Sequence, residues 1–188
     1  MNASSTATPL SRALSTTHTL SWTRRHAIDA VNRPFSEELV ERIKNIIDPA
    51  QIDVLIWNRI EIDHSGSVPR ILELEPNAEV YASAPQGVKE LKAFYGENIN
   101  ANGVRMGDTL NIGKRILTFV QTPMAHWPDN MVIYSDYDKI LFSNDAFGQH
   151  YASSTRFEDE SDYSVCVDRM KWQIKPSYLL RIWGFYVQ

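Results

Sequence analysis

The sequence predicts an α/β fold, and two features of the chain support this prediction. In the first half, amphipathic helical segments alternate with short apolar runs. In the second half, runs of strand character follow one another and are separated by turn residues such as Gly107-Asp108 and Gly113. Since 43% of the 188 residues are hydrophobic, the chain is expected to form one domain with a sizeable core.

The first predicted element is a helix from Ser36 to Ile47. Ser36 is a suitable N-cap, and Asp48-Pro49 ends the helix. The segment from Asp53 to Trp57 follows as an apolar, β-branched run, which predicts a buried strand. The side chains on the apolar helix face are Leu39, Val40, Ile43, Ile46 and Ile47.

The helix and strand pattern then repeats before the chain changes to strands alone. A second helix is expected to begin near Pro69, followed by a strand over Glu79 to Ala82 and a helix over Pro85 to Tyr95. Four further strands are predicted, at 109–112, 115–120, 131–134 and 139–142.

Composition excludes several classes of protein. The net charge is −4 and the basic residues form no long stripe, which argues against a nucleic-acid partner. The single cysteine, Cys166, excludes an internal disulfide and fits a reducing compartment such as the cytoplasm. No apolar run reaches the roughly eighteen residues that suggest a membrane-spanning helix, so no membrane association is predicted.

The two ends differ in composition from the middle of the chain. Residues 1–26 are rich in Ser, Thr and Ala and contain no acidic residue, which favours a disordered or non-homologous start. The alternative is a transit peptide, which would place the protein in an organelle matrix. Residues 161–188 show neither helical nor strand periodicity and are treated as a divergent tail.

Acidic and histidine side chains gather where three predicted strands end. Glu61, Asp63 and His64 follow the strand 53–57, His126 follows the strand 115–120, and Asp145 follows the strand 139–142. Loops at the ends of strands commonly host functional sites. Because carboxylates and imidazoles suit iron, manganese or zinc, these five residues are predicted metal ligands.

Five stretches of the sequence resemble the metallo-β-lactamase-like domain of flavodiiron proteins. Their order and spacing match over residues 27–160, which we take as the di-iron domain, incomplete at its end. The resemblance implies a partial metallo-β-lactamase-like αββα sandwich. The stretches are Arg33 to Leu39, Glu61 to Gly66, Met106 to Leu110, His126 to Asp129 and Leu141 to His150.

The resemblance also implies ligand roles and an activity. Glu61 and His126 would bind one iron, Asp63 the other, and Asp145 would bridge both; His64 is a conditional ligand. Flavodiiron proteins are oxidoreductases that reduce oxygen or nitric oxide at the di-iron centre. Their electrons come from FMN in a flavodoxin-like domain of a neighbouring subunit, which implies a homodimer and a flavoprotein or rubredoxin-type electron donor.

The sequence departs from the family pattern at Arg59. This residue stands where the family has its first histidine ligand, and a guanidinium has no lone pair to offer a metal. A rescue would require Arg59 to turn outward and water to take its place. The last family histidine and the FMN domain would lie beyond Gln188. An alternative interpretation is therefore a truncated, catalytically inactive fragment with weak or no metal binding.

Overall fold

The first of two sheets is parallel and comes from the first half of the chain. The computed structural model describes residues 25–125 and 127–147, together with residues 154, 160, 162, 164 and 165. Sheet A has the order β1-β2-β3-β4, and its strands all run in the same direction. These strands are β1 His26–Ile28, β2 Val54–Trp57, β3 Glu79–Ser83 and β4 Ala101–Val104.

Sheet B is an antiparallel meander from the second half of the described chain. Its order is β5-β6-β7-β8, so each strand pairs with the one that follows it. The strands are β5 Thr109–Asn111, β6 Ile116–Gln121, β7 Met131–Ser135 and β8 Ile140–Phe142.

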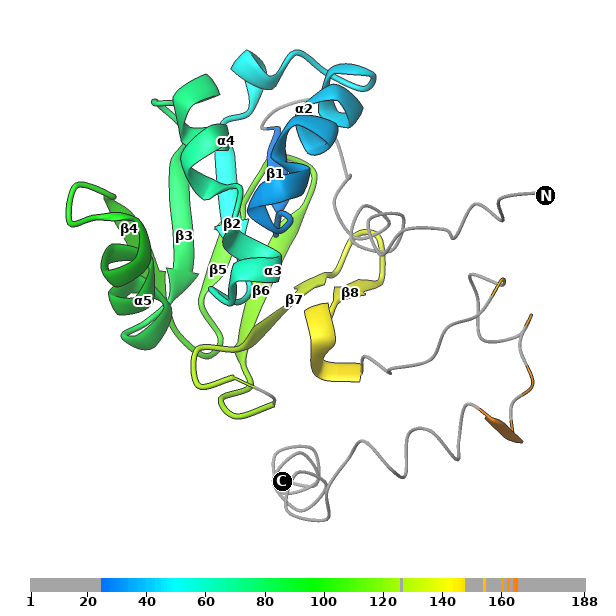
Figure 1. The fold of residues 1–188 in the computed structure, drawn as a ribbon. Coiled ribbons are helices and arrows are strands. Elements are labelled where there is room, and N and C mark those ends of the chain that lie inside the picture. Colours follow the sequence, from blue (N-terminus) through cyan, green and yellow to red (C-terminus); the bar gives the residue numbers. More distant parts are fainter. Residues whose placement is uncertain are drawn as a thin grey trace.

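Helices α2, α4 and α5 cover one face of sheet A (Figure 1). Buried residues of these helices, such as Leu39, Ile71 and Leu91, pack against Leu55 and Val80 of the sheet. Leu55 and Val80 are paired in the sheet and therefore point to the same face. The helical elements are η2 Arg33–Phe35, α2 Ser36–Lys44, η3 Pro49–Gln51, α3 Ile62–Ser65, α4 Val68–Leu74, α5 Gln86–Tyr95 and η4 Asn144–Phe147.

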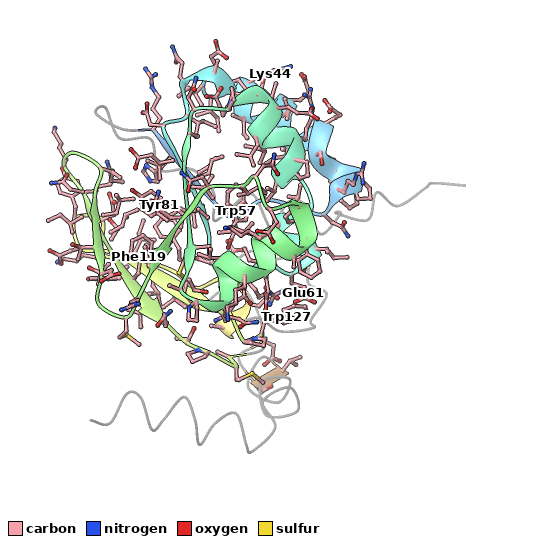
Figure 2. The ribbon with its side chains drawn as sticks, turned by 90° about the vertical axis from the view of Figure 1, so that its left-hand side faces the viewer. Lys44, Trp57, Glu61, Tyr81, Phe119 and Trp127 are labelled. Atoms are coloured by element: carbon pink, nitrogen blue, oxygen red, sulfur yellow. The ribbon has the colours of Figure 1, made fainter. Side chains whose placement is uncertain are left out.

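The opposite face of sheet A packs on sheet B. Ile56 from the first sheet and Leu117, Phe119 and Ile133 from the second belong to one buried cluster. Tyr81 and Phe119 stack across the two sheets with ring centroids 6.4 Å apart, and Figure 2 labels both. The described residues thus form three layers, of helices, sheet A and sheet B, which confirms the α/β class and the sandwich expected from the resemblance.

All eight helices and strands predicted over residues 53–142 are present, with small changes at their ends, and the first predicted helix ends early. It stops at Lys44, because residues 45–47 turn toward η3 instead of continuing the apolar face. The elements that were not predicted have only three or four residues each; they are β1, β4, α3, η2, η3 and η4. No helix in the described part of the chain has both the length and the apolar character needed to span a bilayer.

Candidate metal centre

The carboxyl end of β2 is fastened to both sheets through Asn58, which is fully buried. Its backbone N–H donates to Asp29 Oδ1 at 2.7 Å, just past β1. Its side-chain Nδ2 donates to the carbonyl of Phe142 at 3.2 Å, at the end of β8. Its own carbonyl accepts from the N–H of Met131 in β7 at 3.0 Å. The loop after β2 is therefore held at a fixed place between the two sheets.

Asp129 fixes the same loop at Ile60, two residues after Asn58. Its Oδ2 accepts from the backbone N–H of Ile60 at 2.7 Å, while its carbonyl accepts from Ser83 Oγ at 2.6 Å. Asp129 is 2% exposed, and burial, assisted by the charge of Glu90, raises the pKa of its carboxyl group to about 6. Through these bonds Asp129 fixes the loop after β2.

The short helix α3 carries Asp63 and His64, and hydrogen bonds of Ser65 hold it in place. Ser65 Oγ lies 2.6 Å from the carbonyl of Ile60, to which it donates, and 2.7 Å from the hydroxyl of Tyr95. Gly66 follows with an ordinary right-handed φ of −57°. A Cβ at this position would lie 2.6 Å from the backbone nitrogen of Arg33. Glycine is needed here for the close approach of two backbones.

Asp145 reaches the same place from sheet B. It lies in η4, directly after Asn144, whose φ is +43°. Asn144 Nδ2 donates to the carbonyl of Met131 at 2.9 Å, and Asn144 Oδ1 accepts from the backbone N–H of Asp145. These contacts turn the chain at the end of β8 and direct Asp145 toward the loop after β2.

The guanidinium of Arg59 lies among three of the predicted ligands. Its side chain is 1% exposed. Nη2 lies 2.6 Å from Glu61 Oε2 and 3.3 Å from Asp63 Oδ1, and Nη1 lies 2.7 Å from Asp145 Oδ2. The arrangement with Arg59 turned outward is therefore not the one observed. A fixed positive charge occupies the centre of this carboxylate group.

His64 lies on the other side of Asp145. Its Nε2 is 3.3 Å from Asp145 Oδ1, and its Nδ1 is 3.6 Å from Asp29 Oδ2. Burial opposes the charge of the imidazole, but the contacts with Asp145 and Asp29 outweigh it and raise the pKa of His64 to about 10. His64 and Arg59 together hold the pKa of Asp145 below its usual range.

The family pattern implies two positions for an ion. The first metal position would comprise residue 59, Glu61, His126 and Asp145. The second metal position comprises Asp63, His64 and Asp145, whose potential ligand atoms all lie within 4.8 Å of one another. Four of the five predicted ligands thus converge on one place, and His126 lies outside the described residues.

The family implies two iron ions, and the one expected at the first metal position does not fit there. The ligand atoms of Glu61 and Asp145 already face a buried guanidinium at ion-pair distance. A second cation between them would meet the charge of Arg59 at close range, and arginine does not lose its proton in proteins. The second metal position keeps three donors of the kinds that iron, manganese and zinc accept.

Comparison with known proteins agrees with this fold. The family model described as "ODP family beta lactamase" matches residues 20–174. The chain belongs to this family. Residues 25–125 and 127–147 thus form the described core of a beta-lactamase-like domain, in which Asp63, His64 and Asp145 lie together and Glu61 faces the same Arg59 as Asp145.

The chain is also similar to individual nitric oxide reductases and flavodiiron proteins. The nitric oxide reductase of Moorella thermoacetica is 43% identical over 142 residues, which cover 75% of this chain and 35% of the relative. The rubredoxin oxygen:oxidoreductase of Desulfovibrio gigas has a TM-score of 0.71 and 36% identity, covering 77% of this chain and 36% of that one. The resemblance to flavodiiron proteins is therefore confirmed.

A third relative is covered to a similar extent. The flavodiiron protein of Giardia intestinalis has a TM-score of 0.70 and 39% identity, covering 78% of this chain and 36% of that chain. This chain spans about a third of the length of the curated relatives it matches.

The site contains one residue that sequence reasoning missed. Asp29 faces His64 and also accepts the hydrogen bond from Asn58. It follows the three-residue strand β1 and has a φ of +57°. An aspartate directly after a buried strand is the signal that would have found it, but β1 was too short to be predicted.

Proposed function

We propose that this chain is a flavodiiron-type domain that binds at most one metal ion and does not by itself reduce nitric oxide or oxygen. The observation that supports this proposal is the guanidinium of Arg59, 1% exposed and in contact with Glu61, Asp63 and Asp145. A guanidinium offers no lone pair to a metal and keeps its charge. We infer that Glu61, Asp63, His64, His126 and Asp145 descend from a ligand set and no longer hold two ions.

The chemistry of the relatives explains why the loss of one position matters. Joining two nitric oxide molecules into nitrous oxide and water consumes two electrons and two protons. Two neighbouring metal ions, if bound, would hold the two reacting molecules side by side. A single ion at the second metal position would lack the partner that the coupling requires.

A second candidate function is a working reductase of oxygen or nitric oxide. The observation that favours it is the second metal position, where Asp63, His64 and Asp145 keep ligand atoms within 4.8 Å. In this case the electrons would come through FMN from a flavoprotein or rubredoxin-type donor, and a homodimer would bring the flavin to the iron. We propose a cytoplasmic location for either candidate, and residues 27–160 as the metal domain between the two flanking segments.

Metal content and gas consumption test the proposal. The full chain and the Arg59→His variant are produced anaerobically with iron, freed of loose metal and assayed for iron per chain. Both are then mixed with a reduced flavoprotein donor, and nitric oxide and oxygen consumption are followed. We expect no more than one ion in the wild-type chain, no consumption above that of the donor alone, and more iron in the variant. Two tightly held ions in the wild-type chain would refute the proposal.

A further inference from the structure

We infer that the guanidinium of Arg59 replaces a metal ion as the structural cation of this site, so that the site holds its shape without metal. The inference rests on the proposed function, since it assumes that Arg59 closes the first metal position. It concerns the stability of the chain, which the proposed function does not address.

The first step of the argument is where the partners of Arg59 come from. Glu61 lies in the loop after β2, Asp63 lies in α3, and Asp145 lies in η4 after β8. The closest contacts, at 2.6 Å and 2.7 Å, reach Glu61 and Asp145. One cation thus joins the end of a strand in sheet A to the end of a strand in sheet B.

The second step concerns charge. Three carboxylates at one place repel one another unless a cation lies between them, and this repulsion is strong where water is excluded. Arg59 is among the largest fully buried side chains of the described residues. A bound metal ion could satisfy the same carboxylates, but it would have to be captured from solution. Arg59 is part of the chain and supplies the charge permanently.

The third step is geometric. A guanidinium is planar and presents several N–H groups in a fixed fork, so it faces several carboxylates at once. Here Nη1 of Arg59 faces Asp145, while Nη2 faces Glu61 and Asp63. Lysine would supply the charge at a single point, without the fork. Both the charge and the planar shape of the Arg59 side chain therefore help to hold the three carboxylates together.

Thermal unfolding of the full chain in a metal chelator tests the inference. Arg59→Met removes the charge and keeps much of the volume, which leaves the three partly exposed carboxylates without their buried cation. We expect its Tm to fall by about 5–10 °C, as for a broken buried ion pair in a domain of this size. Arg59→His should lose a similar amount, and Arg59→Lys, which keeps a cation, should lose less than half as much.

Metal addition supplies the decisive readout. With Fe²⁺ under anaerobic conditions, or Zn²⁺ as a redox-inert probe, Arg59→His and Arg59→Met should recover most of the lost Tm, because a metal ion then takes the place of the guanidinium. The wild-type chain should gain less than half of that recovery. Equal metal stabilisation of all three proteins would overturn the inference.

A double-mutant cycle keeps the test informative if a single variant folds poorly. Arg59→Gln, which removes the charge and remains polar, and Asp145→Asn are measured alone and together, and the combined loss of Tm should be smaller than the sum of the two. Additive losses, or variants as stable as the wild-type chain in chelator, would overturn the inference. Neither result bears on iron content or gas consumption, so the inference and the proposed function fail separately.

Discussion

The two metal positions share Asp145 and differ in what faces it. At the first, the partner is Arg59, which is 1% exposed and permanently charged. At the second, the partners are His64, 15% exposed, and Asp63, 52% exposed. One half of the site is thus closed by a fixed cation, and the other half remains open to solvent and to an ion. Under the proposed function, the arginine at position 59 closes the first metal position while the shared carboxylate of Asp145 keeps its place.

The largest effect is expected where the two positions meet. Asp145→Asn removes the charge that faces both Arg59 and His64. The Asp145 side chain is 41% exposed, so we expect a discounted loss of about 2 kcal/mol in the free energy of unfolding at pH 7. Urea unfolding measures this loss. The matched control is Asp136→Asn, which breaks an exposed pair with Lys139 and should cost less than about 0.5 kcal/mol.

The pH dependence of this loss has a defined sign. The pKa of Asp145 is lowered in the folded state from an ordinary value of 3.8. Its charge therefore adds stability above that value, and the contribution disappears as the pH falls below about 4. A difference between wild type and Asp145→Asn that stays constant down to pH 3 would contradict the ion-pair explanation.

A smaller effect is expected on metal affinity, and it should differ between substitutions at the two metal positions. Asp63→Asn removes a donor from the second position and should weaken binding of Zn²⁺ by at least about tenfold, close to 1.4 kcal/mol. Glu61→Gln changes only the first position, which Arg59 already fills, and should leave that affinity within about threefold. Calorimetric titration of both variants gives the comparison. If Glu61→Gln weakened binding more than Asp63→Asn, the assignment of the two positions would be reversed.

The smallest effect concerns the loop that supports both positions. Burial raises the pKa of Asp129 to about 6, so the folded state holds a proton that the unfolded state releases near pH 4. Stability should therefore fall as the pH rises from about 4 to 6, and the lost stability is not regained at pH 7. Asp129→Asn keeps an acceptor for the Ile60 N–H and should be about 1 kcal/mol more stable than wild type at pH 7.

Unfolding curves at several pH values check this prediction. The variant should show a flatter dependence between pH 4 and 6 than the wild-type chain. If Asp129→Asn were less stable than wild type at every pH, the loss of hydrogen-bond strength at Ile60 would outweigh the gain from removing a buried charge.

Periodicity in the sequence was sufficient for the longer elements and insufficient for the short ones. The helix α5 and the strands β6 and β7 have enough residues to show an apolar pattern, and they were predicted nearly to their ends. β1 and β4 have three and four residues, and β4 reads Ala-Asn-Gly-Val, which is poor in strand-forming residues. Such strands form because a neighbouring strand offers hydrogen bonds, and this information is not local.

By itself, the sequence determined the fold class, the kinship with flavodiiron proteins and the residues to examine, including the misfit at Arg59. Spacing along the chain carries that information, since Glu61, Asp63 and His64 lie together in any conformation. Only the tertiary structure decided that Arg59 points inward. Its direction depends on Asp145, which lies far along the chain and arrives from the other sheet. Two distant charges pair only where folding brings them together and excludes water from one of them.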